Sequence, residues 1–323
     1  MVSSALGSIL TGDSAPGVKS EMTRMPNFFI IGAPKCGTTS LAAWLAGNPA
    51  IFVSPIKEPY YFSVDLRYRF IGEWDDYLRL FRDAGDEAVA VGEATTAYLF
   101  SRDAVPLIEN KFSSAKYIVM VRNPVDMAYS LHEQQLFSDR ETVRDFGEAW
   151  NLSSERRHGR EVPAHCVEPL LLDYQSFCRL GEQVERLFCV VPRERILLLV
   201  LDDMRLNPRE EYLKTLDFLG APDDGRMDFP VHNRAKRWRS RQVGRMIRAA
   251  AQLVARAKHT TGMLPRRSLG LIDFLRSQVT DQQRRPAMPK ELRAELERFF
   301  SPDIAELERL LGRDFPGWRE TYE

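Results

Sequence analysis

At 323 residues, the chain is long enough for one large α/β domain or two small ones. Its hydrophobic content of 44% and charged content of 28% are typical of globular proteins. Lysine plus arginine and aspartate plus glutamate number 45 each, so no net field favours nucleic acid as a partner. No apolar run approaches the roughly 20 residues that span a bilayer.

The N-terminal residues and the cysteines bear on location. Residues 1–25 lack the charged and apolar regions of a signal peptide and are predicted to be a disordered leader. The cysteines form no C-x-x-C pair, so they indicate neither a zinc site nor a disulfide framework. Reduced thiols in a cytoplasmic protein are the simpler interpretation. The five histidines show no ligand spacing, and we expect no metal.

The segment from Asn27 to Trp44, NFFIIGAPKCGTTSLAAW, predicts an anion-binding loop. Its apolar start, Phe28–Ile31, reads as a buried parallel strand. A turn of small residues around Lys35 follows, and an amphipathic helix begins at Thr38. Amides and the dipole at a helix N-terminus attract anions, and the lysine adds a full charge. The loop would also contain Cys36, Gly37, Thr39 and Ser40.

The position of the lysine argues against an ordinary nucleoside triphosphatase. The P-loop pattern G-x-x-x-x-G-K-[ST] would need lysine where Thr38 stands. An ordinary strand, turn and helix is the plainer alternative. Nearby positive charge could lower the pKa of the Cys36 thiol; the other interpretation is a small residue that fills a tight turn.

Two further strands are predicted before residue 100. Ile51–Val53 reads as a strand, and the aromatic loop after it contains Lys57, which could line an acceptor site or lie in solvent. A helix is expected over Glu73–Arg82. The apolar run Val89–Gly92 is followed at once by Glu93, at the sheet edge where ligands bind in this architecture. A salt-bridged structural glutamate is the alternative.

The strongest strand, Ala115–Val121, leads into a second candidate anion site. Arg122 follows the strand, and Ser130 lies on the second turn of the next helix, so both could reach one phosphate. Pairing of the arginine with Asp126 is the alternative. His132 lies on the same helix and reads either as an acceptor-site residue or as a core residue.

The rest of the chain predicts more α/β structure. Residues 140–165 read as a mobile polar excursion over an acceptor cleft, and residues 232–241 as a basic loop that contains Lys236 and Arg239. The remaining predictions are helices over 170–188, 207–219, 245–257 and 290–311 and a strand over 195–201.

The order P-K-x-G-T-T-S around Lys35 resembles the phosphosulfate-binding loop of sulfotransferases that use 3′-phosphoadenosine 5′-phosphosulfate (PAPS). The run V-R-N-P-x-D-x-A-x-S resembles their second signature, which implies that Arg122 and Ser130 hold the 3′-phosphate. The basic loop at 232–241 stands where this family closes over the nucleotide. The segment Glu93-Ala94-Thr95 resembles the E-K-[ST] segment of heparan-sulfate-type members, which implies that Glu93 is the general base. Because Ala94 replaces the lysine, a positive charge is missing there.

The resemblance spans about residues 26–318. It implies one P-loop-like α/β domain over 26–323, with a central parallel sheet flanked by helices. The expected reaction moves a sulfuryl group from PAPS to a hydroxyl or amine of a sugar, lipid or small molecule, with 3′,5′-bisphosphoadenosine as product. A kinase-like phosphotransferase and a non-catalytic nucleotide-binding module are the alternatives. The kinase would need lysine after Gly37, and the module would not need Glu93.

Overall fold

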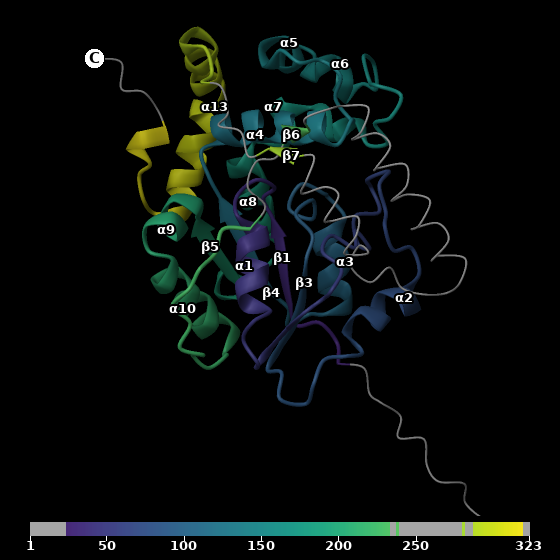
Figure 1. Cartoon of the computed structure of the whole chain (residues 1–323), viewed down its shortest axis with the longest axis vertical. Coiled ribbons are helices and arrows are strands. Elements are labelled where there is room, and N and C mark those ends of the chain that lie inside the picture. Colours follow the sequence, from purple (N-terminus) through teal and green to yellow (C-terminus); the bar gives the residue numbers. More distant parts are fainter. Residues whose placement is uncertain (1–23, 233–236, 239–279, 282–286, 319–323) are drawn as a thin grey trace, which may run out of the picture.

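The computed structural model describes residues 24–232, 237–238, 280–281 and 287–318. Five strands form one parallel sheet in the order β2-β3-β1-β4-β5 (Figure 1). Their bounds are β1 Phe28–Gly32, β2 Ile51–Val53, β3 Ala90–Ala94, β4 Lys116–Val121 and β5 Ile196–Val200. The short strands β6 Arg237–Trp238 and β7 Thr280–Asp281 pair separately and antiparallel.

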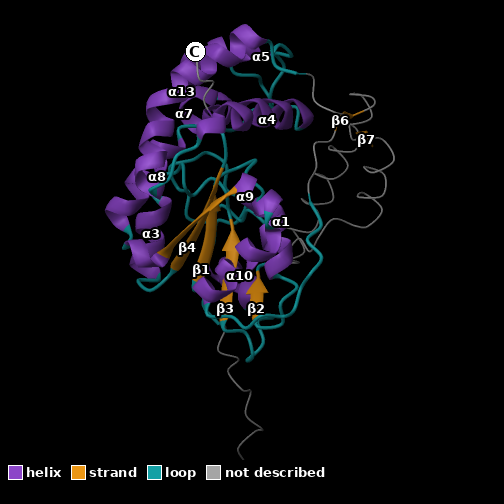
Figure 2. Ribbon diagram, turned by 90° about the vertical axis from the view of Figure 1, so that its left-hand side faces the viewer, coloured by secondary structure: helices purple, strands orange, loops and turns teal. Residues whose placement is uncertain are grey.

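Helices cover both faces of the sheet. In Figure 2, α3 and α8 lie on one side of the strands and α1 on the other. Burial on both faces explains why β1 and β4 are continuous apolar runs. The predicted fold class, a parallel sheet flanked by helices, is therefore confirmed. The α-helices of the described residues are α1 Thr38–Leu45, α2 Trp74–Leu78, α3 Ala104–Lys111, α4 Pro124–Phe137, α5 Phe146–Asn151, α6 Ser153–Arg157, α7 Tyr174–Phe177, α8 Leu180–Val190, α9 Leu201–Leu206, α10 Pro208–Leu219 and α13 Lys290–Leu311.

The long C-terminal helix α13 has the predicted bounds and is tied to α8. Asp303 accepts hydrogen bonds from the Gly181 and Glu182 amides at 3.0 Å each. These are amides of the first turn of α8, which have no partner within their own helix. The α13 carboxylate therefore fixes where α8 begins. No helix in the described part of the chain is long and apolar enough to cross a membrane.

The prediction of one helix over 170–188 is wrong. A 3₁₀ turn over Pro169–Leu172, the short α7 and the longer α8 replace it. The first break comes at Asp173, whose side chain accepts a hydrogen bond from the Ser176 amide. Aspartate favours this capping position over a helix interior. An ion pair with Arg157, whose side chain is half-exposed, holds the buried Asp173 there.

The segment 140–165, predicted as a mobile excursion, contains helices α5 and α6. Arg156 and Glu141 are both fully buried and form a two-pronged ion pair at 2.6 and 2.9 Å. Tyr174 adds a hydrogen bond to Glu141 at 3.0 Å. Because a charge buried without its partner would be strongly destabilising, the pair fastens this segment to the helical layer.

For other predicted elements, the structure has a different set of helices or does not describe the residues. The helix expected over 73–82 is α2 followed by a 3₁₀ turn, Arg79–Phe81. Two short helices, α3 and α9, were not predicted, because one or two turns leave too little periodicity to detect. Residues 1–23 of the predicted leader, the helix over 245–257, and both Lys236 and Arg239 lie outside the described residues.

Candidate active site

The loop between β1 and α1 is held by its backbone. Gly37 has a φ of 93°, a left-handed conformation that favours glycine. The Ala33 amide donates to the Met120 carbonyl at 2.8 Å, so the loop is fixed to the end of β4. The predicted turn of small residues is thus present at the carboxyl edge of the sheet, where open α/β sheets bind ligands.

The first turn of α1 suits an anion. It carries no acidic side chain, and no side-chain hydrogen bond caps it. The amides of Gly37, Thr38 and Thr39 therefore need acceptors from outside the helix, and the helix dipole favours negative charge there. Lys35 lies half-buried in the same loop.

Arg122 joins the second predicted signature to this loop. Its Nη1 donates to the Lys35 carbonyl oxygen at 3.0 Å, and only 11% of its side chain is exposed. The pairing with Asp126 also exists, at 3.7 Å. Ser130 follows Asp126 by four residues and therefore shares its face of α4. The two predicted anion-binding segments thus meet at one end of the sheet.

Ser40 has a structural partner on the return segment. Its Oγ accepts a hydrogen bond from the His232 amide at 2.9 Å. On the same helix, the Trp44 indole donates to the Pro230 carbonyl at 3.0 Å and packs on Phe229. Residues 229–232 therefore run along α1 towards the anion loop, directly before the undescribed basic residues.

Glu93 lies within β3 rather than beyond it, because the strand continues to Ala94. Its side chain is fully buried and accepts hydrogen bonds from Thr95 at 2.6 Å and from Tyr77 and Tyr98 at 3.0 Å each. Burial raises the pKa of Glu93 to about 7, although the three donors oppose the rise. Its assignment as the base stays a prediction.

A second glutamate, Glu58, was missed by the sequence reasoning. It follows Lys57, and its amide donates to the Ala94 carbonyl at 2.8 Å, so it lies beside the end of β3. Its carboxylate accepts from Lys57 at 3.0 Å, Tyr60 at 2.5 Å and Thr96 at 2.9 Å, with 29% of the side chain exposed. Burial acts to raise the pKa of Glu58, but the lysine charge and these donors hold it below its usual value. The sequence signal for Glu58 was the run Lys57-Glu58-Pro59, from which only the lysine was considered.

Two other predicted residues lie in the interior. Cys36 is fully buried, and burial raises the pKa of its thiol to about 12 despite the charges of Arg122 and Lys35. The thiol pKa is therefore not lowered, and the burial of Cys36 fits the interpretation of a small residue that fills the tight turn. His132 is 1% exposed, packs on Phe146 and has its Nε2 within hydrogen-bond distance of the Val143 carbonyl. These contacts fit the alternative interpretation of His132 as a core residue. Burial lowers the pKa of His132.

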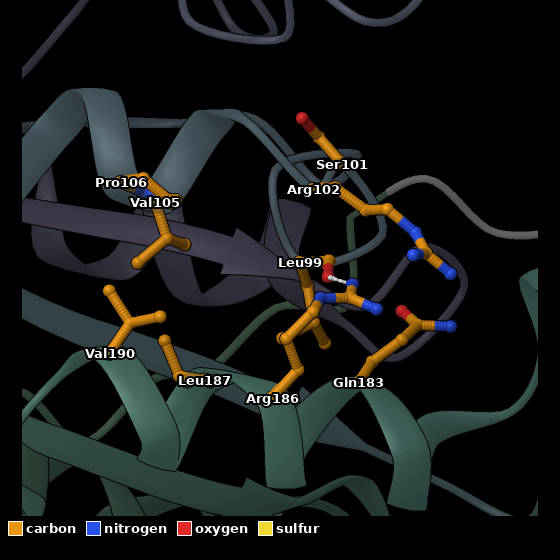
Figure 3. A pocket seen from close by; sticks show the side chains of 9 residues that line it. All are labelled: Leu99, Ser101, Arg102, Val105, Pro106, Gln183, Arg186, Leu187 and Val190. Atoms are coloured by element: carbon orange, nitrogen blue, oxygen red, sulfur yellow. Dashed lines mark hydrogen bonds between the residues drawn. The ribbon is translucent and has the colours of Figure 1, made fainter.

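The pocket in Figure 3 lies apart from these residues. It is lined from α3, α8 and the chain before α3, and Arg186 donates there to the Leu99 carbonyl at 2.7 Å. No predicted site residue lines it. Among the described residues, no cluster of three or more histidine, cysteine, aspartate or glutamate side chains could hold a metal ion.

Comparison with known proteins shows which proteins this chain is similar to. The family model described as the sulfotransferase domain matches residues 25–238, more than half of the chain. Carbohydrate sulfotransferase 15 of Homo sapiens is 28% identical over 158 residues, which is 36% of this chain and 28% of that protein. The bifunctional heparan sulfate N-deacetylase/N-sulfotransferase 2 of Mus musculus is 26% identical over 208 residues, 61% of this chain and 22% of that protein.

Two more matches extend the comparison. The membrane-associated sulfotransferase kil1 of Dictyostelium discoideum is 32% identical over 116 residues, 35% of this chain and 24% of that protein. The matches thus span about a quarter of these curated relatives. The crystal structure of a sulfotransferase from Alicyclobacillus acidocaldarius is similar with a TM-score of 0.66 at 29% identity, covering 92% of this chain and all of that one.

Proposed function

Because the chain belongs to the sulfotransferase domain family, we propose that it transfers a sulfuryl group from PAPS to a hydroxyl or amine. The observation that carries this proposal is the hydrogen bond from Arg122 to the Lys35 carbonyl. It joins two separate anion-binding segments, as a donor nucleotide with phosphates at both its 3′ and 5′ positions requires. A single P-loop would need only the first.

Each segment takes one end of the nucleotide. Lys35 and the amides that open α1 bind the 5′ side and stabilise the negative charge that gathers on the leaving phosphate. Arg122 and Ser130 bind the 3′-phosphate, because a guanidinium and a hydroxyl are strong donors to phosphate oxygens. Catalysis is then chiefly positioning and charge stabilisation, as in phosphoryl transfer.

A carboxylate takes the acceptor's proton as the acceptor attacks. Glu93 is the residue predicted for this role, but its side chain has no exposed surface. Glu58 is partly exposed, and a lowered pKa keeps it ionised at neutral pH. We therefore assign the base to Glu58 and keep Glu93 as the alternative that mutation tests.

Sugars are the first acceptor class to test, because relatives are named as carbohydrate and heparan sulfate enzymes. The predicted cytoplasmic location stays a prediction, and one relative is named as membrane-associated.

The decisive experiment incubates the protein with PAPS and panels of sugars, lipids and phenols, and mass spectrometry detects the added sulfuryl group. Thermal shifts with PAPS, 3′,5′-bisphosphoadenosine and ATP separate the alternatives, because a ligand that binds the folded state raises Tm. A shift by ATP alone would indicate the kinase-like alternative. Nucleotide binding without transfer to any acceptor would indicate the binding module.

A further inference from the structure

Tyr60 lies two residues after Glu58 and completes its hydrogen bonding. The Tyr60 hydroxyl donates to Glu58 Oε2 at 2.5 Å, whereas Oε1 accepts from Lys57 at 3.0 Å and Thr96 at 2.9 Å. Each oxygen of an ionised carboxylate has about two acceptor positions. Among the donors of the described residues, two therefore fill Oε1, and Oε2 keeps one position next to the tyrosine hydroxyl.

The backbone presents these two side chains in an unusual way. Glu58 and Tyr60 have φ values of 64° and 56°, in the left-handed region that residues other than glycine seldom occupy. Pro59 lies between them, and its carbonyl accepts a hydrogen bond from the Ile71 amide at 3.0 Å. Such conformations persist only where the surrounding structure enforces them, and they gather at functional sites.

The Tyr60 hydroxyl keeps its proton and donates to Glu58 at neutral pH. Burial and the negative charge of Glu58 raise the pKa of Tyr60 well above its usual value, so the phenol stays protonated. The Tyr60 ring is packed edge-on against Tyr68 with ring centres 4.9 Å apart. Tyr60 therefore cannot accept a proton itself, but it can fix the carboxylate that does.

We infer that Tyr60 is a positioning residue, whose hydroxyl orients Glu58 and directs the free position of Oε2 towards the acceptor. This role rests on the sulfuryl transfer proposed above. In that step the acceptor's proton moves to Oε2 while the new bond to sulfur forms. The bond from sulfur to the phosphate oxygen breaks, and the phosphate leaves with the electron pair. Tyr60 keeps its own proton throughout.

The kinetic test compares Tyr60→Phe with Tyr68→Phe, which removes a neighbouring hydroxyl that is not among the side-chain donors to Glu58. Without the Tyr60 hydroxyl the Glu58 carboxylate loses the contact that orients Oε2, so kcat of Tyr60→Phe should fall by about tenfold. Loss of the donor should also move the acid limb of kcat/KM up by about one pH unit. Nucleotide affinity should stay unchanged, and Tyr68→Phe should keep the wild-type pH profile. A Tyr60→Phe profile that superimposes on the wild type would overturn the role.

A second measurement does not depend on turnover. Carboxyl ¹³C NMR of the whole protein, with the Glu58 signal assigned by its loss in Glu58→Gln, gives the pKa of Glu58 directly. We expect that pKa to rise by about one unit in Tyr60→Phe and to stay constant in Tyr68→Phe. A constant pKa in both variants would overturn the role of Tyr60 even in an active enzyme. If the pKa of Glu58 rises in Tyr60→Phe but the wild-type protein sulfates no acceptor, the proposed function is contradicted instead.

Discussion

Glu58 and Glu93 both lie at the carboxyl end of β3, and each accepts three side-chain hydrogen bonds. Glu58 has a lysine among its donors and is partly exposed, and its pKa is lowered. Glu93 has only hydroxyl donors and no exposed surface, and burial raises its pKa to about 7. A nearby cation thus decides which buried carboxyl group stays charged.

The aromatic residues explain why Glu93 is enclosed. Its donor Tyr77 stacks on Tyr61 and packs edge-on against Phe62 and Phe81. Glu93 therefore ties helix α2 to the sheet through the Tyr77 hydroxyl, at 3.0 Å. A carboxyl group enclosed in such a network has a structural role, whereas a partly exposed one is free to exchange protons with a ligand.

The largest expected effect comes from Glu58→Gln. This variant keeps the shape of the side chain but cannot accept the acceptor's proton, so kcat should fall by about 10²- to 10⁴-fold. Single-turnover kinetics with a saturating acceptor measures the loss. The same preparation should bind 3′,5′-bisphosphoadenosine normally, because Glu58 lies on the acceptor side in the proposed mechanism.

The wild-type pH profile sharpens the same comparison. A base at Glu58 puts the acid limb of kcat/KM below pH 4.5, the unperturbed value. A base at Glu93 would put that limb near pH 7. A limb near neutrality, together with an active Glu58→Gln protein, would return the role to Glu93.

The next effect concerns Lys35, which should matter whichever glutamate is the base. Lys35→Ala removes a positive charge next to the leaving phosphate, so turnover should fall by about 10²- to 10³-fold. Titration calorimetry should show weaker PAPS binding as well, which neither glutamate variant is expected to produce. Near-normal turnover would remove Lys35 from the phosphosulfate loop.

A smaller effect is expected from Arg122→Ala, with Ser130→Ala as its milder companion. Wild type should bind 3′,5′-bisphosphoadenosine much better than adenosine 5′-phosphate. Arg122→Ala should lose about 10- to 100-fold of that preference, since a charge-assisted hydrogen bond is worth about 1.5–3 kcal/mol. Competition binding with the two nucleotides measures it. Equal affinity in the wild type would contradict the assignment of the 3′-phosphate site.

The anion loop and the main strands were predictable because their signals are local. Phe28–Ile31 and the strand before Arg122 are apolar runs, and the run around Lys35 determines a turn and a helix start within a few residues. The contrast between the glutamates was not predictable. Glu93 depends on Tyr77, which is 16 residues away along the chain. The carboxylate of Glu58 depends on Thr96, which is 38 residues away along the chain. The left-handed φ of Glu58 was not predictable either, because a single residue's conformation leaves no repeating pattern in the sequence.

The prediction of one helix over 170–188 was wrong for a related reason. Apolar residues at helical spacing continue from residue 170 to 188, so periodicity alone joins three elements into one. The break depends on Asp173, which caps α7 while it pairs with Arg157. Such a pairing between segments becomes visible only when the fold is known.

Glu93→Gln should have the smallest effect on turnover and a clear effect on stability. In the folded protein the pKa of Glu93 is about 7, against 4.5 for the unperturbed group. Between these values the folded state binds more protons than the unfolded state, so the free energy of unfolding falls as pH rises from about 4.5 to 7. This rise in the pKa corresponds to an upper bound of about 3 kcal/mol. The glutamine variant cannot titrate, so this fall should be absent from its urea-unfolding curves at pH 5, 6, 7 and 8.

The kcat of Glu93→Gln per folded molecule should stay within about threefold of the wild type, because the variant removes no interaction made only in the transition state. A 10²-fold loss of kcat with an unchanged dependence of stability on pH would make Glu93 the base and Glu58 a structural residue.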